Sequence, residues 1–169
     1  MKHTLLFLLM ICACTLQATA TGKQPRLTDD ELMTLVQKQT FRYFWGFAHP
    51  ESGLARERSN DRLEIATIGG SGFGVMAIIV GVERGFITRE QGAERLLKIV
   101  EFLNKADSYH GIWAHWMDGA TGKTIPFSRK DDGADLVESA FMFEGLLAAH
   151  QYFCLLYTSP SPRDLSTSR

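Results

Sequence analysis

Apolar residues recur at helical spacing in two segments of the chain, and each segment begins with a capping box. In the first, Thr28 is followed three residues later by Glu31, and in the second Thr88 is followed by Gln91. The apolar positions of the first segment are Leu32, Leu35, Val36, Tyr43, Phe44 and Phe47. Those of the second are Ala93, Leu96, Leu97, Val100 and Leu103. Both patterns predict amphipathic helices, the first ending before the turn residues 49–53 and the second near residue 105.

Two further segments are apolar enough to form helices. Residues 75–82 are an unbroken apolar run after a glycine-rich stretch (69–74), and this run predicts a buried helix that is closed by Gly85. Residues 135–153 resume an amphipathic pattern. No strand-rich segment competes with these four helices. The predicted fold class is therefore all-α, built from stacked helical hairpins that bury their faces against neighbouring hairpins.

Helical spacing disappears between residues 106 and 130, where aromatic, His, Gly and Pro residues gather. A loop of this length is usually functional or disordered, and its aromatic residues favour a functional loop. Trp113, His115 and Trp116 suit a sugar ligand, because indole faces pack on C–H surfaces while indole N–H and imidazole groups hydrogen-bond hydroxyls. The alternative interpretation is a loop that its tryptophans hold in position.

Four carboxylates follow within eight residues: Asp131, Asp132, Asp135 and Glu138. Asp135 and Glu138 have the spacing of an N-cap and its N3 partner, which would explain those two as capping groups. Capping does not explain Asp131 and Asp132, whose negative charges would repel those of the other two carboxylates. Since crowded carboxylates raise the pKa of one member, the segment also suits general acid catalysis.

The sequence does not indicate cofactor, metal or nucleic-acid binding. The glycine-rich stretch fits neither the Walker A motif nor the dinucleotide fingerprint, so we expect no cofactor. We interpret its glycines as making room either for close helix packing or for the approach of the backbone to a ligand. His110 and His115 have no further His at ligand spacing, and residues 21–153 contain no cysteine, so we expect neither a metal site nor a disulfide. The formal net charge is −1, without the clustered Lys and Arg of a nucleic-acid-binding protein.

The two ends of the sequence differ in character from the middle. Residues 1–20 combine a basic start, an apolar run and a small-residue cleavage site, which indicates an export signal, and Cys14 leaves a lipoprotein signal as the alternative. We expect an exported monomer, periplasmic or an outer-membrane lipoprotein, that meets a membrane only through this signal or a lipid anchor. Residues 154–169 resemble translated sequencing adapter, because the codons of a transposase adapter spell the first eleven of them without a mismatch. The predicted domain is then 21–153.

Four longer motifs resemble a known enzyme family. They are TFRYFW (40–45), GLARER (53–58), IGGSGFG (68–74) and KDDGADLVE (130–138). Together they resemble the bacterial glucoamylase-like proteins of glycoside hydrolase family 144, over about residues 27–153. The resemblance implies the N-terminal part, about four helices, of an α/α toroid of six helical hairpins. It also implies hydrolysis of β-1,2-glucans or sophoro-oligosaccharides, with inversion and without a metal.

The resemblance also implies roles for individual residues. The family's acidic pocket residues, implied to be catalytic, match Asp131, Asp135 and Glu138. The residues implied to bind substrate are Trp113, His115, Trp116 and Asp132. A further pocket acid of the family would lie beyond Phe153, so we expect the chain to be an inactive fragment by itself.

Spacing limits which carboxylates can cooperate. Residues three apart on a helix have Cβ atoms about 5–6 Å apart, whereas an inverting acid and base lie roughly 6.5–9.5 Å apart. Asp135 and Glu138 are therefore too close to form that pair, whereas Asp131 and Glu138, if both helical, would be about 10 Å apart along the axis. Our hypothesis is that Glu138 or Asp135 donates the proton. The alternative is a non-catalytic glycan-binding or helical scaffold protein that uses its acids as caps.

Overall fold

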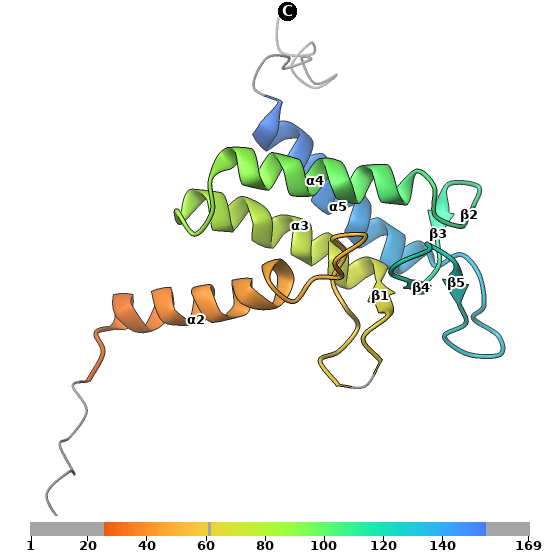
Figure 1. Ribbon diagram of the computed structural model, residues 1–169, viewed down its shortest axis with the longest axis horizontal. Helices are drawn as coiled ribbons and strands as arrows, with labels where there is room; N and C mark the ends of the chain where they lie inside the picture. The colour runs from red at the N-terminus through yellow and green to blue at the C-terminus, as the bar shows by residue number, and fades with distance from the viewer. Residues whose placement is uncertain (1–25, 61, 155–169) are drawn as a thin grey trace, which may run out of the picture. The chain divides into compact units, whose positions relative to one another are not determined.

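The computed structural model describes residues 26–60 and 62–154 (Figure 1). The predicted export signal (1–20) and residues 155–169 of the predicted adapter tail lie outside the described residues. The described part holds four helices and five short strands, which confirms the all-α fold class in its main elements. The chain divides into two compact units, the first ending at Thr34 and the second beginning at Leu35.

Helix α2 (Asp29–Trp45) begins in the first unit with the predicted capping box. The Thr28 hydroxyl accepts a hydrogen bond from the Glu31 N–H (3.3 Å), and Glu31 Oε2 accepts one from the Thr28 N–H (2.8 Å). These reciprocal bonds satisfy two donors that a helix N-terminus otherwise leaves unpaired. The predicted start of the helix is therefore confirmed.

The part of α2 in the second unit buries a different position from the predicted apolar stripe. Phe41 is buried and stacks on Trp45, with ring centroids 5.7 Å apart. Leu35 and Val36, which belong to the predicted stripe, are exposed. The periodicity thus indicated a helix correctly, but the packing partners decided which apolar residues it buries.

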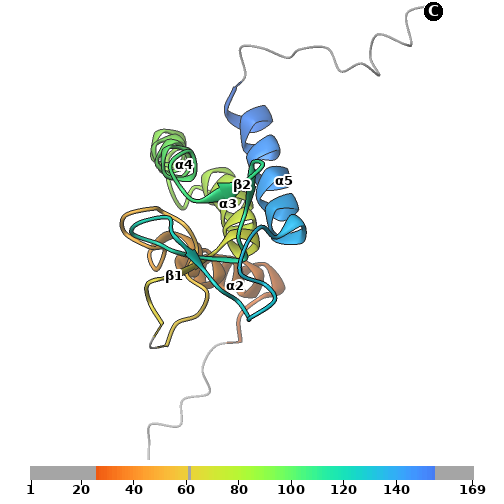
Figure 2. The same ribbon diagram turned by 90° about the vertical axis from the view of Figure 1, so that its right-hand side faces the viewer.

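Helices α3 (Ile68–Glu83) and α5 (Leu136–Phe153) lie side by side with their backbones in close contact (Figures 1 and 2). A Cβ atom added at Gly145 would lie 2.6 Å from the Gly72 carbonyl oxygen, and one added at Gly72 would collide with the Phe141 carbonyl. Side chains at these two positions would force the helices apart. This confirms the interpretation that glycines make room for close helix packing.

The apolar run expected to form a buried helix is buried on one face only. Val75 and Ile78 are fully buried, whereas Phe73, Met76 and Val80 are exposed. The helix also starts at Ile68, so that the glycine-rich stretch forms its first turns. Within the described residues α3 packs against α4, α5 and the rings of Phe41 and Phe44, and these partners leave part of its apolar run exposed.

Helix α4 (Arg89–Leu103) starts at the second predicted capping box, in which Thr88 and Gln91 exchange hydrogen bonds. Its apolar side packs against α3. The fully or nearly fully buried core residues include Leu54, Ile68, Val75, Ile78, Leu96, Ile99, Met117 and Met142. This core draws on α3, α4, α5 and the segments that connect them.

The expected loop at 106–130 contains short strands, which the sequence pattern did not predict. Strands β2 (Ser108–Tyr109) and β3 (Ile112–Trp113) form one hairpin. Strands β1 (Ile65–Thr67), β4 (Trp116–Asp118) and β5 (Thr124–Ile125) form an antiparallel sheet in the order β1-β4-β5. Strands of two or three residues are too short to show an alternating pattern, and so the periodicity could not reveal them.

None of the helices among the described residues combines the length and the apolar character needed to cross a membrane.

We expect Gly145→Ala to destabilise the chain by about 1–3 kcal/mol, because the new methyl group would press on the Gly72 carbonyl. Alanine's helix propensity would by itself favour the change. Urea unfolding followed by tryptophan fluorescence measures the difference. Gly46→Ala is the matched control, since its Cβ would meet only the Arg42 carbonyl at 3.5 Å. An unchanged or raised unfolding midpoint for Gly145→Ala would contradict the close packing of α3 on α5.

Candidate functional site

The candidate site forms where the segment between β3 and β4 meets the starts of two helices. Ala114 bridges Ala134 in the stretch before α5, and the Asp135 N–H donates to the Trp113 carbonyl (2.8 Å). The Ile68 N–H, at the first residue of α3, donates to the carbonyl of His115 (3.2 Å). The N-termini of α3 and α5 therefore both adjoin the backbone around His115.

His115 is the centre of the site, with three carboxylates around its imidazole. Its Nδ1 lies 3.0 Å from Asp135 Oδ2 and 4.0 Å from Asp131 Oδ2, and its Nε2 lies 3.9 Å from Glu138 Oε1. The four side chains are between 18% and 34% exposed, so that they are sheltered but reachable. The structure thus brings together four of the seven residues that the sequence nominated.

Asp135 uses both carboxylate oxygens as hydrogen-bond acceptors. Oδ1 caps α5 by accepting from the N–H groups of Val137 (2.9 Å) and Glu138 (3.0 Å), and Oδ2 accepts from His115. Burial raises the pKa of this carboxyl, but the hydrogen bonds from Glu138, His115 and Val137 outweigh that effect, and the pKa is lowered from its ordinary value. Asp135 is therefore an ionised acceptor near neutral pH.

Glu138 lies in the first turn of α5 and reaches across to the start of α3. Its Oε2 accepts hydrogen bonds from the Gly69 N–H (2.8 Å) and from the Thr67 hydroxyl (3.1 Å). A side chain at residue 69 would occupy the position of this carboxylate, because its Cβ would lie 2.6 Å from Oε2. The requirement for glycine at residue 69 therefore comes from Glu138.

Asp131 precedes α5, so the condition under which its distance from Glu138 was derived, that both residues are helical, is not met. It lies in a short loop, where its backbone pairs with Ser128. The loop carries its carboxylate back toward His115. Oxygen atoms of Asp131 and Asp135 and a nitrogen of His115 all lie within 4.8 Å of one another. This is the one group among the described residues that could offer three ligand atoms to a metal ion, although the Nδ1 of His115 is already bonded to Asp135.

The aromatic residues divide between the site and the core. Trp116 borders the site, with its ring edge-on to His115 at 5.9 Å. Trp113 packs instead against the hydrophobic core, where its ring lies 5.1 Å from that of Phe143 and its Nε1–H donates to the Leu103 carbonyl (3.4 Å). Trp113 therefore matches the alternative interpretation, in which tryptophan anchors the loop.

Phe127 is a site residue that sequence reasoning missed. Its ring stacks on His115 at 4.1 Å and contacts Trp116 at 4.7 Å, so the imidazole is covered on one face. Phe127 is nevertheless 46% exposed. The available signal was that Phe127 is the sole aromatic residue between Trp116 and the acidic segment.

Glu57 is a second missed residue, on the segment that runs beside β1. Its N–H donates to the Ile65 carbonyl (2.9 Å). A hydrogen bond from Arg58 lowers the pKa of its carboxyl, burial opposes that effect, and the charges of Arg58, Arg62 and His115 lower the pKa further. The charge of His115 is thus the smallest of the influences on the pKa of this carboxyl in the GLARER motif (53–58).

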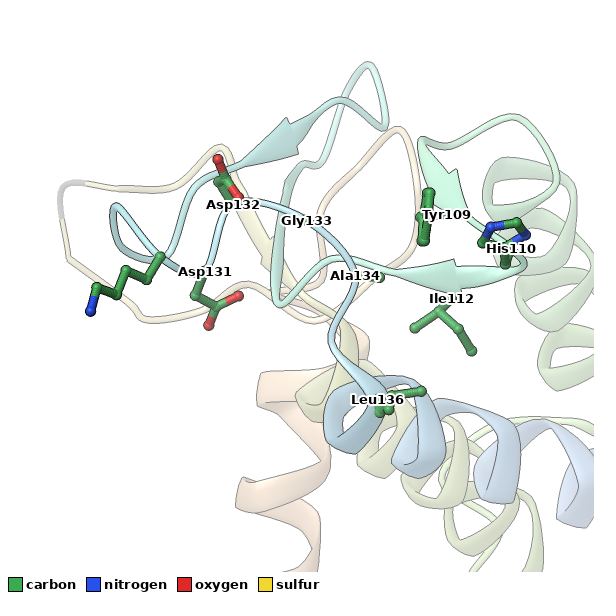
Figure 3. A pocket seen from close by; sticks show the side chains of 9 residues that line it. Tyr109, His110, Ile112, Asp131, Asp132, Gly133, Ala134 and Leu136 are labelled. Carbon is green, nitrogen blue, oxygen red and sulfur yellow. The ribbon is translucent and has the colours of Figure 1, made fainter.

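An open cavity of about 540 Å³ lies beside the acidic loop. Its lining is formed by Tyr109, His110, Ile112, Lys130, Asp131, Asp132, Gly133, Ala134 and Leu136. Figure 3 shows the side chains of Asp131 and Asp132 extending in different directions from this loop. Asp132 is exposed and lines the cavity, without joining the group around His115. Asp131 belongs to both the cavity and that group.

No family model matches the chain. Individual proteins and solved structures, however, are similar to it. The chain is 56% identical over 128 residues to the exo-β-1,2-glucooligosaccharide sophorohydrolase of Parabacteroides distasonis, a match that covers 75% of this chain and 18% of that protein. A candidate glucoamylase from Bacteroides uniformis is 76% identical in its solved structure, with a TM-score of 0.76 over 85% of this chain and 34% of that one. The endo-β-1,2-glucanase of Chitinophaga pinensis, solved with sophorotriose and glucose, is 50% identical, with a TM-score of 0.75 over 83% of this chain and 34% of that one.

The chain thus spans about a third or less of the length of these relatives. At these identities and TM-scores the likeness extends to the fold, which is part of a glucoamylase-like α/α toroid. The homologues of this chain are accordingly glucoamylase-like and β-1,2-glucanase proteins.

Proposed function

We propose that this chain is part of a glycoside hydrolase of family 144 that cleaves β-1,2-glucan or sophoro-oligosaccharides by acid–base catalysis. The observation that carries the proposal is the convergence of Asp131, Asp135 and Glu138 on one imidazole beside an open cavity. Relatives whose names specify β-1,2-linked glucan substrates support the choice of substrate. The endo-acting and exo-acting relatives leave both modes of attack open for this protein.

The short distances within the acidic group bear on stereochemistry. Oxygens of Asp131 and Asp135 lie within 4.8 Å, whereas an inverting acid and base lie roughly 6.5–9.5 Å apart so that a water fits between them. These two carboxylates are too close to form an inverting pair. Inversion therefore requires a partner other than this pair, and the family resemblance implies a further pocket acid beyond Phe153.

Asp131 is the carboxylate best suited to act on substrate. Asp135 already accepts hydrogen bonds from His115 and from the first turn of α5. Glu138 accepts one from the Gly69 N–H at the start of α3. Asp131 is 34% exposed in its side chain and lines the open cavity, while its contact with His115 is 4.0 Å long. This assignment replaces our hypothesis that Asp135 or Glu138 donates the proton.

The proposed function is tested in an exchanged protein, in which residues 27–153 of this chain replace the matching segment of the Chitinophaga pinensis endo-β-1,2-glucanase. We expect the exchanged protein to release reducing ends from β-1,2-glucan and not from starch or β-1,3-glucan. Asp131→Asn is expected to lower kcat by about 10²–10⁴-fold, the usual contribution of a general acid or base.

Glu101→Gln is the matched control for that experiment, because Glu101 is an exposed carboxylate of α4 and should leave activity unchanged. A folded exchanged protein that leaves β-1,2-glucan uncut would contradict the proposed function. Binding of sophorotriose without hydrolysis, unaffected by Asp131→Asn, would instead support the glycan-binding alternative.

A further prediction concerns Asp135 and pH. Because its pKa is lower in the folded than in the unfolded chain, Asp135 stabilises the fold above the ordinary Asp range, and this contribution is lost as pH falls through the lowered value. Asp135→Asn keeps an acceptor oxygen for the α5 cap but cannot titrate. Its unfolding midpoint should therefore fall less between about pH 7 and pH 3 than that of the unchanged chain. Parallel decreases in both proteins would refute the role of Asp135 as an ionised cap.

We also propose that both ends of the printed sequence lie outside the enzyme's folded domain. The signal-like pattern of 1–20 supports export, to the periplasm or as an outer-membrane lipoprotein through Cys14. The adapter-like codons of residues 154–164 support a native reading frame that continues beyond Phe153. Sequencing the source locus across that codon, and measuring the mass of the exported protein, test the two parts. A frame that ends at Arg169, or an uncleaved N-terminus, would count against them.

A further inference from the structure

The N-terminus of α3 differs from those of the other three helices in lacking a cap of its own. Asp135 caps α5 through its own side chain, and Thr28 and Thr88 cap α2 and α4. At α3 the N-cap residue is Thr67, whose side chain makes no capping hydrogen bond, and the first turn contains no acidic residue. The first N–H groups of a helix have no partners within it, so α3 needs an acceptor from elsewhere.

Glu138 supplies this acceptor from a neighbouring helix. Its Oε2 accepts from the N–H of Gly69, the second residue of α3, and from the Thr67 hydroxyl, which here acts as a donor. A carboxylate at this position also interacts favourably with the positive end of the helix dipole. Glu138 therefore does for α3 what Asp135 does for α5.

The two caps are linked into one chain of contacts. Asp135 Oδ1 accepts from the Glu138 N–H (3.0 Å), while the Glu138 side chain binds Gly69. The second oxygen of Glu138 faces Nε2 of His115 at 3.9 Å, too far for a hydrogen bond. Oε2, by contrast, is already engaged as an acceptor by two donors.

We propose that Glu138 is a positioning residue whose carboxylate caps α3 from α5, and that this cap, rather than proton transfer, is its contribution to the site. The cap fixes the start of α3, whose first N–H holds the backbone of His115. Glu138 thereby acts through His115 on the orientation of the acidic group. The inference rests on the proposed function only in taking this group as the active site.

The first experiment compares variants of the full chain without any substrate. Glu138→Ala removes the acceptor and is expected to lower the folding equilibrium constant by about five- to tenfold, the usual effect of losing an N-cap. Glu138→Gln retains an acceptor oxygen and should recover most of that loss. Glu101→Ala, an exposed position on α4, is the control and should change little. Equal stability of Glu138→Ala and the unchanged chain, or equal losses for Ala and Gln, would overturn the proposal.

Two further measurements on the chain test the cap directly. Thr67→Val removes one donor, and its cost should largely disappear when Glu138 is already alanine, because the two residues share one interaction. Sodium formate should raise the unfolding midpoint of Glu138→Ala relative to equal sodium chloride, since formate can occupy the vacated anion position. It should not raise that of the unchanged chain. Additive costs, or no effect of formate, would count against the cap.

Activity in the exchanged glucanase separates positioning from proton transfer. A positioning role predicts that Glu138→Ala lowers kcat, and that Glu138→Gln recovers most of that loss and keeps both limbs of the pH profile, because its amide oxygen can still accept the two bonds. A proton donor predicts a loss of about 10²–10⁴-fold and removal of one limb of the pH profile. That second result, with stability retained, would overturn the proposal.

The two experiments also separate the two proposals from each other. An exchanged protein that folds but is inactive before any substitution would refute the proposed function, while the stability comparison would still decide the cap. If the chain by itself does not unfold cooperatively, the same variants are compared in the exchanged protein by thermal melting.

Discussion

The close approach of α3 and α5 is the constraint on which the rest of this structure depends. Gly72 and Gly145 allow the two backbones to touch, and any larger residue at either position would separate them. At the same end of the pair, Gly69 leaves room for the Glu138 carboxylate. The glycines thus do more than permit packing, because they bring two helix N-termini within reach of one set of acidic side chains.

The carboxylates of the acidic group lie close together, and their mutual repulsion is offset because two of them accept hydrogen bonds from helix N-termini. Helix N-termini supply N–H donors to Asp135 and Glu138, and the imidazole of His115 lies among the carboxylates. For Asp135 these hydrogen bonds outweigh burial and lower the pKa, while Asp131 lines the cavity. Helix capping alone would not require three carboxylates. Two of them, Asp135 and Glu138, hold the helix starts in place, and the third, Asp131, is open to a ligand.

Local features of the fold could be predicted from the sequence. The capping boxes at Thr28 and Thr88 depend on residues three positions apart, so their formation needs no distant partner. The strands could not be predicted in this way, because they hold two or three residues and depend on partners far along the chain. The structure brings the predicted acids and His115 together, whereas it packs Trp113 against the core and adds Phe127, which the sequence analysis did not name.

The sequence by itself determined where helices begin, that glycines mark a close contact, and that the acidic segment is unusual, since each follows from the chemistry of neighbouring residues. Only the tertiary structure decided what those features contact. It paired Glu138 with Gly69, 69 residues away, and returned Asp131 to His115 through a loop. The physical reason is that a carboxylate can serve as a cap, an ion-pair partner or an acid, and which role it takes depends on the donors around it in space.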